Sequence, residues 1–247
     1  MIELKSADEL ERMRRAGQVV ARLLEHVTAL VRPGMKTREL DREALALIKR
    51  EGAQPAFLGY RGFPASICVS VNEEVVHGIP GDRKIQEGDL VSVDAGAVVD
   101  GFYADAAITV MVGAVTPEAR RLTEATRRAL ACGIRQAVAG NRLSDISHAV
   151  QDAVDQEGFG IVREFVGHGI GRALHEDPPI PNFGPPHMGP RLKAGMVLAI
   201  EPMVTLGGPD VQVLDDGWTA VTKDGSLAAH FEHTVAVTDR GPEILTE

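Results

Sequence analysis

The feature of this sequence that most constrains its fold is an internal repeat of a helix, a second helix and a strand. When Gly34 is placed on Gly140, the apolar positions and the glycine that follow coincide in the two segments. The coinciding pairs are Leu40 with Ile146, Ala44 with Val150, Ile48 with Val154, and Gly52 with Gly158. Further along, two similar apolar strands end in acids, Asp94 and Glu201. A pseudo-two-fold axis between the halves would therefore bring these two carboxylates together.

The strand that carries Asp94 also begins a predicted hairpin. Apolar and small or polar side chains alternate over 91–96, a period of two that is typical of a β-strand with Asp94 on one face. A second strand, at about 102–112, can return beside it because the Asp-Gly dipeptide at 100–101 tolerates the positive φ of a tight turn. This second strand carries Asp105. The two aspartates would face the same spot, where burial is costly unless a cation neutralises them or one carries a proton.

Three further polar residues lie in comparable surroundings. Glu201 follows an apolar run, Glu232 lies in His-Phe-Glu-His-Thr-Val, and His168 lies among glycines in 167–171. With the two aspartates they predict a hard, oxygen-rich metal site. Five ligands exceed what one catalytic ion with an open position usually takes, so two divalent ions about 3.5 to 4 Å apart fit better. The donor set favours Mn, Fe(II) or Co over a structural zinc, and zinc stays a candidate as a catalytic ion.

Composition excludes several classes of protein. The 247 residues are 44% hydrophobic, which is enough for a substantial core. The net charge of −9 would repel nucleic acid and anionic lipid, so we expect neither as a partner. The sequence has no signal pattern at its start and no apolar run of the roughly 18 residues that a membrane span needs. Because Cys68 and Cys132 are the two cysteines, we expect no disulfide framework and a cytoplasmic location.

Four segments have helical periodicity and end signals. The first begins with a capping box, and the third with a threonine cap followed by proline. We expect Ser144 to cap the fourth. The proline-rich segment 177–190 predicts a long loop, because its prolines permit neither a helix nor an inner strand. The predicted helices run from Ser6 to before Pro33, from Thr37 to Gly52, from Thr116 to Gly140 and from Ser144 to Gly158.

Several short motifs occur in the order and at the spacings of one known family. They are His-Gly-Ile-Pro at 77–80, Asp94 with Asp105, Gly-His-Gly-Ile-Gly at 167–171 with His-Glu at 175–176, Ile-Glu-Pro-Met at 200–203, and Phe-Glu-His-Thr at 231–234. With these motifs the chain resembles type I methionine aminopeptidase over nearly its whole length. The resemblance implies an α+β pita-bread fold, a pseudo-two-fold duplicated antiparallel sheet backed by helices. We expect one catalytic domain over 1–247, with halves of about 1–115 and 116–247.

The resemblance also assigns roles around the metal site. It implies that Asp94 binds one ion, that Asp105 and Glu232 bridge both, and that His168 with Glu201 completes the other. Glu201 is also the group expected to take and pass the proton of the attacking water. The resemblance further implies that His77 and His175 contact the substrate amide and stabilise the developing oxyanion. Among the other histidines, only His233 is a candidate for supporting the site, because it adjoins Glu232.

A pocket for a methionine side chain should be narrow and apolar. The residues that resemble the family's pocket are Tyr60, Phe63, Cys68 and Trp218. Family members vary at the positions of Phe57, Arg61 and Leu174, so the fine shape of the pocket stays open.

The function implied is removal of the initiator methionine from nascent proteins whose second residue is small. The enzyme would be a monomeric metallo-aminopeptidase that works on nascent N-termini near the ribosome. One alternative is a proline-specific peptidase of the same fold, although such enzymes usually carry a further N-terminal domain. Another is an inactive binding module of the same fold, although all five ligands are present here.

Overall fold

The computed structural model describes residues 2–247. The helices are α1 (Ala7–Leu30), α2 (Thr37–Arg50), the short 3-10 helix η1 (Tyr60–Gly62), α3 (Pro117–Gln136) and α4 (Leu143–Asp155). The strands of the first half are β1 (Gln54–Pro55), β2 (Ile67–Val71), β3 (Glu74–Val76), β4 (Leu90–Val99) and β5 (Phe102–Met111). Those of the second half are β6 (Gly160–Ile161), β7 (Gly167–Gly169), β8 (Glu176–Ile180), β9 (Val197–Ile200), β10 (Met203–Thr205), β11 (Val211–Val213), β12 (Ala220–Thr222), β13 (Ala228–His230), β14 (Glu232–Thr238) and β15 (Gly241–Ile244). No helix in this part of the chain combines the length and apolar character needed to span a bilayer.

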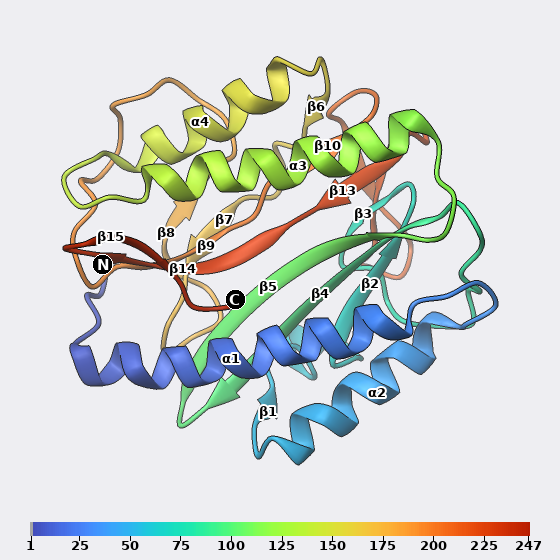
Figure 1. Cartoon of the computed structure of the whole chain (residues 1–247), viewed down its shortest axis with the longest axis horizontal. Helices are drawn as coiled ribbons and strands as arrows, with labels where there is room; N and C mark the ends of the chain where they lie inside the picture. The colour runs from blue at the N-terminus through green and yellow to red at the C-terminus, as the bar shows by residue number, and fades with distance from the viewer. Residues whose placement is uncertain (1) are drawn as a thin grey trace.

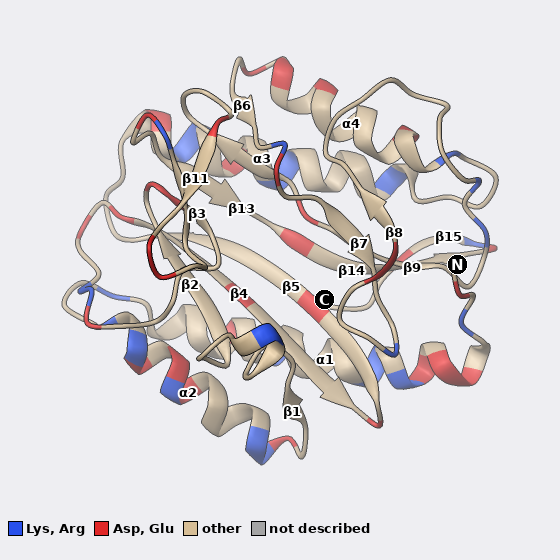
Figure 2. Ribbon diagram, turned by 180° about the vertical axis from the view of Figure 1, so that it is seen from behind, with Lys and Arg blue, Asp and Glu red and all other residues tan. Residues whose placement is uncertain are grey.

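A nine-stranded antiparallel sheet organises the molecule. Its main order is β1-β4-β5-β14-β9-β7-β8, with β2 added on β4 and β15 on β14. Two smaller sheets, β13-β10-β6 and β11-β12-β3, flank it. All four α-helices cover one face, α1 and α2 over one half and α3 and α4 over the other (Figure 1). Acidic residues occur on the neighbouring strands β4, β5 and β14, which are seen in Figure 2 from the side opposite to that of Figure 1. The predicted α+β architecture, with helices backing an antiparallel sheet, is confirmed.

The two halves repeat the same backbone connections. Each half ties the loop before its second helix to the segment that leads into its central strand. The equivalent contacts are the N–H of Gly34 with the carbonyl of Ile85, the N–H of Gly140 with that of Leu192, and the bridges of Lys36 with Lys84 and of Arg142 with Arg191. The duplication visible in the sequence is therefore also a duplication of contacts.

Three helices begin where the sequence predicts, and one cap is different. Ser6 and Glu9 form the predicted capping box of α1, and Thr116 caps α3 ahead of its proline. The prediction that Ser144 caps α4 is wrong, because the helix already begins at Leu143. The Ser144 hydroxyl instead accepts the N–H of Met188 at 2.7 Å. The Ser144 hydroxyl therefore bonds to a segment distant in sequence, and not to the first turn of the helix as the local pattern predicts.

The prediction of a loop throughout 177–190 is also partly wrong. Residues 176–180 form β8, a strand that pairs with β7 at one edge of the sheet. Pro178 and Pro179 lack an N–H, which excludes them from inner strands but is tolerated at an edge. The remaining residues of the segment contain no helix or strand.

Candidate active site

Two aspartates lie in the middle of the β4–β5 hairpin, on the face away from the helices. Val91 and Val93 are buried in the core that α1 and α2 cover, so the alternating Asp94 faces the other way. In the antiparallel register Asp94 pairs with Ala107 and Asp105 pairs with Gly96, which makes the aspartates diagonal neighbours. Their carboxylates therefore share one region of the sheet face, as the hairpin prediction requires.

The remaining predicted ligands come from three segments on the other side of β5. Glu232 begins β14 and pairs with Ala107, the residue that also pairs with Asp94. His168 lies in β7, and Glu201 directly follows β9. The flanking glycines let β7 approach its neighbours, because a Cβ on Gly167 would overlap the carbonyl of Ala199. Glycine at this position is therefore required by packing.

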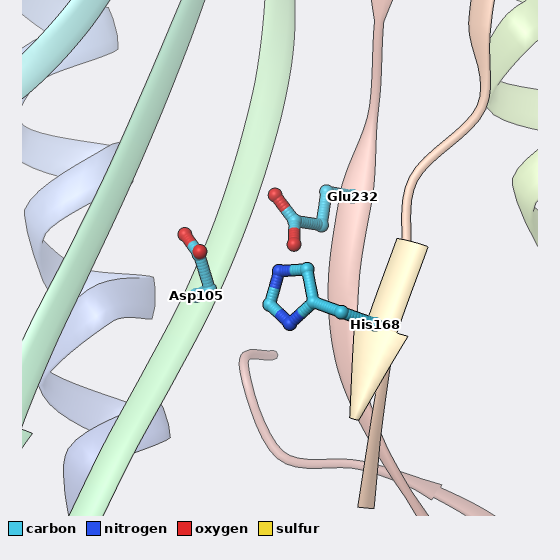
Figure 3. A group of neighbouring side chains, drawn as sticks. All are labelled: Asp105, His168 and Glu232. Carbon is cyan, nitrogen blue, oxygen red and sulfur yellow. The ribbon is translucent and has the colours of Figure 1, made fainter. Parts of the chain in front are cut away.

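Three of these side chains form a compact group of metal-binding atoms. Ligand atoms of Asp105, His168 and Glu232 all lie within 4.8 Å of one another, and all three residues are buried. Figure 3 shows that the three side chains point toward one another from separate strands. Glu201 adjoins the group, since its Oε1 lies 3.6 Å from Nε2 of His168.

The charges in this group have no counterion among the described residues. Asp94 Oδ1, Asp105 Oδ1 and Glu232 Oε1 are buried without a hydrogen-bond partner. Burial raises the pKa of Asp94 to about 7. Burial, reinforced by repulsion among the acids, raises the pKa of Asp105, Glu201 and Glu232 well above the usual range. Orphaned oxygens in a cluster of like charge fit divalent cations, which would satisfy both the lone pairs and the charge.

The neutral charge and the tautomer of His168 both suit a metal ligand. Burial lowers its pKa to about 3, so the imidazole is neutral. Its Nδ1 lies 2.9 Å from the carbonyl oxygen of Gly169 and donates to it, since a carbonyl can only accept. This leaves the lone pair on Nε2, the atom that faces Glu201.

The metal-free protein should lose stability as the pH rises from about 6.5 to 8. Acids with a raised pKa keep protons in the folded state that the unfolded chain has released, so the stability they contribute is lost as pH rises through the folded value, about 7 for Asp94. Below about pH 6.5 the lowered pKa of buried His168 acts in the opposite direction, which is why the test starts there.

The measurement is the unfolding temperature of EDTA-treated protein across this pH interval, with a matched series in Mn²⁺. The Mn²⁺ series should not fall, because bound metal displaces the protons. A flat metal-free series would contradict the assigned charge cluster.

The cluster forms the floor of a pocket of about 150 Å³. Every residue predicted for the site lines it, together with the three variable positions. The lining residues are Phe57, Tyr60, Arg61, Phe63, Cys68, His77, Asp94, Asp105, His168, Leu174, His175, Glu201, Trp218 and Glu232. One wall is aromatic, since the rings of Phe63 and Trp218 meet edge to face at 5.1 Å. Cys68 stays a neutral thiol, because burial and the nearby acids raise its pKa. The pocket therefore combines a narrow apolar wall with an acidic floor.

Two histidines stand beside the acids without belonging to the compact group. His175 lies at the exposed mouth, where its Nδ1 is 2.9 Å from the Tyr60 hydroxyl and its ring is 4.1 Å from that of His168. Partial burial and the charge of Arg61 lower its pKa. His77 contacts Trp218 edge to face at 6.3 Å, and burial lowers its pKa to about 4. Both imidazoles are therefore neutral near pH 7 and able to donate one hydrogen bond each.

Comparison with known proteins identifies the family. The model of metallopeptidase family M24 matches residues 11–239. The chain belongs to metallopeptidase family M24. Methionine aminopeptidase 1 of Bacillus subtilis is 53% identical over 246 residues, covering all of this chain and 99% of the relative. The methionine aminopeptidase of Clostridium perfringens is 52% identical over the same share of each chain.

Solved structures agree with this assignment to family M24. The crystal structure of methionine aminopeptidase from Thermotoga maritima has a TM-score of 0.98 and 49% identity, with both chains covered completely. Prolidase from Pyrococcus furiosus has a TM-score of 0.82 at 24% identity, and this chain covers 65% of its length. The prolidase shares the fold, whereas the methionine aminopeptidases share the fold and half of the sequence. The predicted pita-bread fold and the predicted use of divalent metal by this M24 enzyme are confirmed.

One residue of this M24 site was missed by the sequence argument. His230 is 1% exposed, and its Nε2 has no hydrogen-bond partner among the described residues. That nitrogen lies 3.8 Å from Oε2 of Glu201. Burial lowers the pKa of His230 to about 3. The available signal was the spacing of two residues between His230 and Glu232, which is the period of a strand face, although the structure places the two residues in separate strands, β13 and β14.

His233 does not support the site. Its register places it opposite Ala106 and Ile200, on the face away from Glu232. There its Nδ1 lies 2.9 Å from the Thr246 hydroxyl, within a groove between α1 and α3. Because side chains alternate along a strand, the residue next to Glu232 faces the other side of the sheet.

A buried ion pair braces the loop that carries His175. Lys5 Nζ lies 2.6 Å from Oε2 of Glu176, and the two side chains are 2% and 16% exposed. The other oxygen of Glu176 accepts the N–H groups of Arg172 and Ala173. The N-terminal segment therefore holds this loop from outside.

Removing the cation of this pair, with Lys5→Met, should cost about 3 kcal/mol of folding free energy, because it leaves a largely buried carboxylate without its counterion. Denaturant unfolding would measure the loss. The exposed pair of Arg22 with Glu51 supplies the control, since Arg22→Met should cost less than about 1 kcal/mol. Equal losses of folding free energy in the two variants would show that the pair of Lys5 with Glu176 does not stabilise this loop more than an exposed ion pair would.

Proposed function

We propose that this protein removes an N-terminal methionine from polypeptides by metal-dependent hydrolysis of the first peptide bond. The observation that carries the proposal is the buried group of unpartnered carboxylates beneath a narrow, largely apolar pocket. The full-length similarity to methionine aminopeptidases supports methionine as the residue that fills the pocket. The activity class is a hydrolase.

The residues proposed to hold two divalent ions are Asp94, Asp105, His168, Glu201 and Glu232. We assign Asp94 to one ion, His168 with Glu201 to the other, and Asp105 with Glu232 to both. When bound, such ions lower the pKa of a water and polarise the scissile carbonyl. The identity of the metal is open among Co, Mn, Fe(II) and Zn.

The chain's own side chains perform the remaining tasks. Glu201 accepts the proton of the attacking water and delivers it to the departing amine, because it borders the cluster and keeps a second oxygen free of it. His77 and His175, both neutral, donate hydrogen bonds to the substrate amide and its developing oxyanion. The side chain of the first residue packs against Phe63, Cys68 and Trp218, which excludes water from the cleaved bond.

We further propose that residues 1–247 act as one catalytic domain with pseudo-symmetric halves. We also propose that it is a cytoplasmic monomer that acts on nascent chains near the ribosome. The free cysteines support a reducing compartment, and the net charge of −9 supports the expectation that the protein does not bind nucleic acid itself.

The test is a peptide assay with EDTA-treated protein and each of Mn²⁺, Fe²⁺, Co²⁺ and Zn²⁺. Met-Ala-Ser should be cleaved after its first residue, with at least one of these metals required. Cleavage of Ala-Pro-Ser in preference to Met-Ala-Ser would support a proline-directed peptidase of the same fold. Absence of cleavage despite bound metal would support an inactive module.

The second residue should control turnover. A bulky β-branched residue beside the metal group displaces the reacting carbonyl, and about 1 Å of misplacement can cost roughly 10²-fold in rate. We therefore expect Met-Ile-Ser to be cleaved about 10²-fold more slowly than Met-Ala-Ser, measured as kcat/KM. Equal rates for the two peptides would show that the site does not restrict the second residue.

A further inference from the structure

The imidazole of His230 has a buried nitrogen, Nε2, that has no hydrogen-bond partner among the described residues and no role in the site as assigned so far. Most buried polar atoms have a hydrogen-bond partner, so an orphaned imidazole nitrogen beside an active site requires one. The unpartnered carboxylate oxygens nearby are explained by metal binding, but Nε2 of His230 is not. Nε2 of His230 is therefore a buried polar atom of this site that neither a hydrogen bond nor the proposed metal binding accounts for.

The backbone of His230 is fixed on both sides. Thr109 Oγ1 accepts the N–H of His230 at 2.9 Å and donates to its carbonyl at 2.8 Å. The Thr109 hydroxyl is itself held by Ser92, 2.8 Å away. Because the backbone is held at this position, the buried imidazole can move only by rotation of its own side chain, so its partner must be among its present neighbours.

One such neighbour is Glu201, whose two oxygens face different histidines. Oε1 lies 3.6 Å from Nε2 of His168, and Oε2 lies 3.8 Å from Nε2 of His230. His168 belongs to the compact metal-binding group and His230 does not. One oxygen of Glu201 therefore faces the metal group, while the other faces an imidazole outside it. When Glu201 is ionised, as metal binding requires, its carboxylate can only accept, so the hydrogen then belongs on Nε2 of His230.

We propose that His230 is a positioning residue that donates its Nε2 hydrogen to Oε2 of Glu201 and so fixes how Glu201 faces the metal group. The contact is longer than a hydrogen bond here, and such contacts often tighten only in the working complex. The inference rests on the proposed function, because His230 would orient Glu201, the residue proposed to transfer the proton of the attacking water. Groups that orient a metal-binding side chain typically contribute 10- to 100-fold to metal affinity or activity.

The experiment compares a donor-free side chain with a donor-bearing one. His230→Leu removes the donor, His230→Gln restores an N–H, and His230→Met is a second donor-free variant if the leucine variant fails to fold. The matched control is His233→Leu, which changes a histidine on the opposite face of β14. Calorimetric titration of EDTA-treated protein with Mn²⁺ alone gives affinity and the number of bound ions. Turnover of Met-Ala-Ser at saturating Mn²⁺ gives kcat and KM.

The donor-free variant should bind Mn²⁺ about 10-fold more weakly, with the number of ions at saturation unchanged. Its kcat should fall about 10-fold while KM stays within about two-fold, since the contact acts on the reacting groups and not on substrate binding. His230→Gln should return both affinity and kcat to within about three-fold of wild type. The control should match wild type in Mn²⁺ affinity, because it leaves Glu201 untouched.

Three results would overturn the proposal. If His230→Leu binds one ion fewer at saturation, His230 is a metal ligand. If His230→Leu cleaves Met-Ile-Ser rapidly, His230 instead limits the space for the second residue of the substrate. Equal behaviour of His230→Leu and His233→Leu would show that the contact is idle. If wild type binds Mn²⁺ but cleaves no methionyl peptide, the proposed function fails, and the Mn²⁺ affinities of the leucine and glutamine variants still decide the role of His230.

Discussion

Asp105→Asn is expected to change the stability of this protein in opposite directions with and without metal. Without metal, the substitution removes a buried acid whose pKa is raised by burial and by the neighbouring acids, and with it the cost of ionising or protonating that acid at pH 7.5, so the unfolding temperature should rise. With metal, the stabilisation from binding should be lost. An ion at about 1,000 times its Kd adds about 4 kcal/mol, which corresponds to roughly 10 °C for a chain of this size. Turnover of Met-Ala-Ser should fall to the detection limit.

Glu232→Gln should behave in the same way, because both residues are assigned to both ions. Calorimetric unfolding in EDTA and in Mn²⁺, combined with metal analysis, measures the effect. The control is Asp100→Asn in the turn of the same hairpin, where the carboxylate is exposed and contacts Arg15. It should alter neither metal content nor turnover. Two retained ions with normal activity in Asp105→Asn would disprove the assigned metal site.

His175→Ala should lower turnover and leave metal binding intact. The imidazole lies at the mouth of the pocket and outside the compact metal-binding group. Loss of one donor to a developing oxyanion costs about 10²- to 10³-fold in kcat, and we expect a fall in this range. Metal content and Mn²⁺ affinity should stay near the wild-type values.

Tyr60→Phe provides a graded companion to this variant, because it removes only the hydroxyl that lies 2.9 Å from Nδ1 of His175. Its kcat should fall less than that of His175→Ala, since the imidazole remains in place. Steady-state kinetics with Met-Ala-Ser and metal analysis would test both variants together. Loss of metal in His175→Ala would identify His175 as a ligand and revise the site.

Patterns among neighbouring residues predicted the strand face of Asp94 and the hairpin that brings Asp105 beside it. Alternation over 91–96 placed Asp94 on the face opposite the valines, and the structure agrees. The Asp-Gly turn returned β5 beside β4, which brought Asp105 to the same face. These two inferences hold because a strand's period and a tight turn's backbone are set by adjacent residues. The repeat also predicted that Asp94 and Glu201 end equivalent strands, and this is correct only for Glu201, because β4 continues past Asp94 to Val99.

Contacts between distant segments were not predictable in this way. Ser144 had the chemistry of a helix cap, yet its hydroxyl is taken by Met188. Lys5 belongs to no motif in the sequence, yet it is buried against Glu176, 171 residues away. The partners of Ser144 and Lys5 depended on which distant segment the fold brought alongside.

Patterns among neighbouring residues were enough to predict that Asp94 and Asp105 share a strand face, because periodicity and turn chemistry act over a few residues. The other placements in the site required the tertiary structure. It set the diagonal offset of Asp94 and Asp105, placed His233 behind the sheet, and brought His230 to Glu201. Register and side-chain environment arise from pairing between strands far apart in the chain, and burial in that pairing leaves the carboxylates without a counterion.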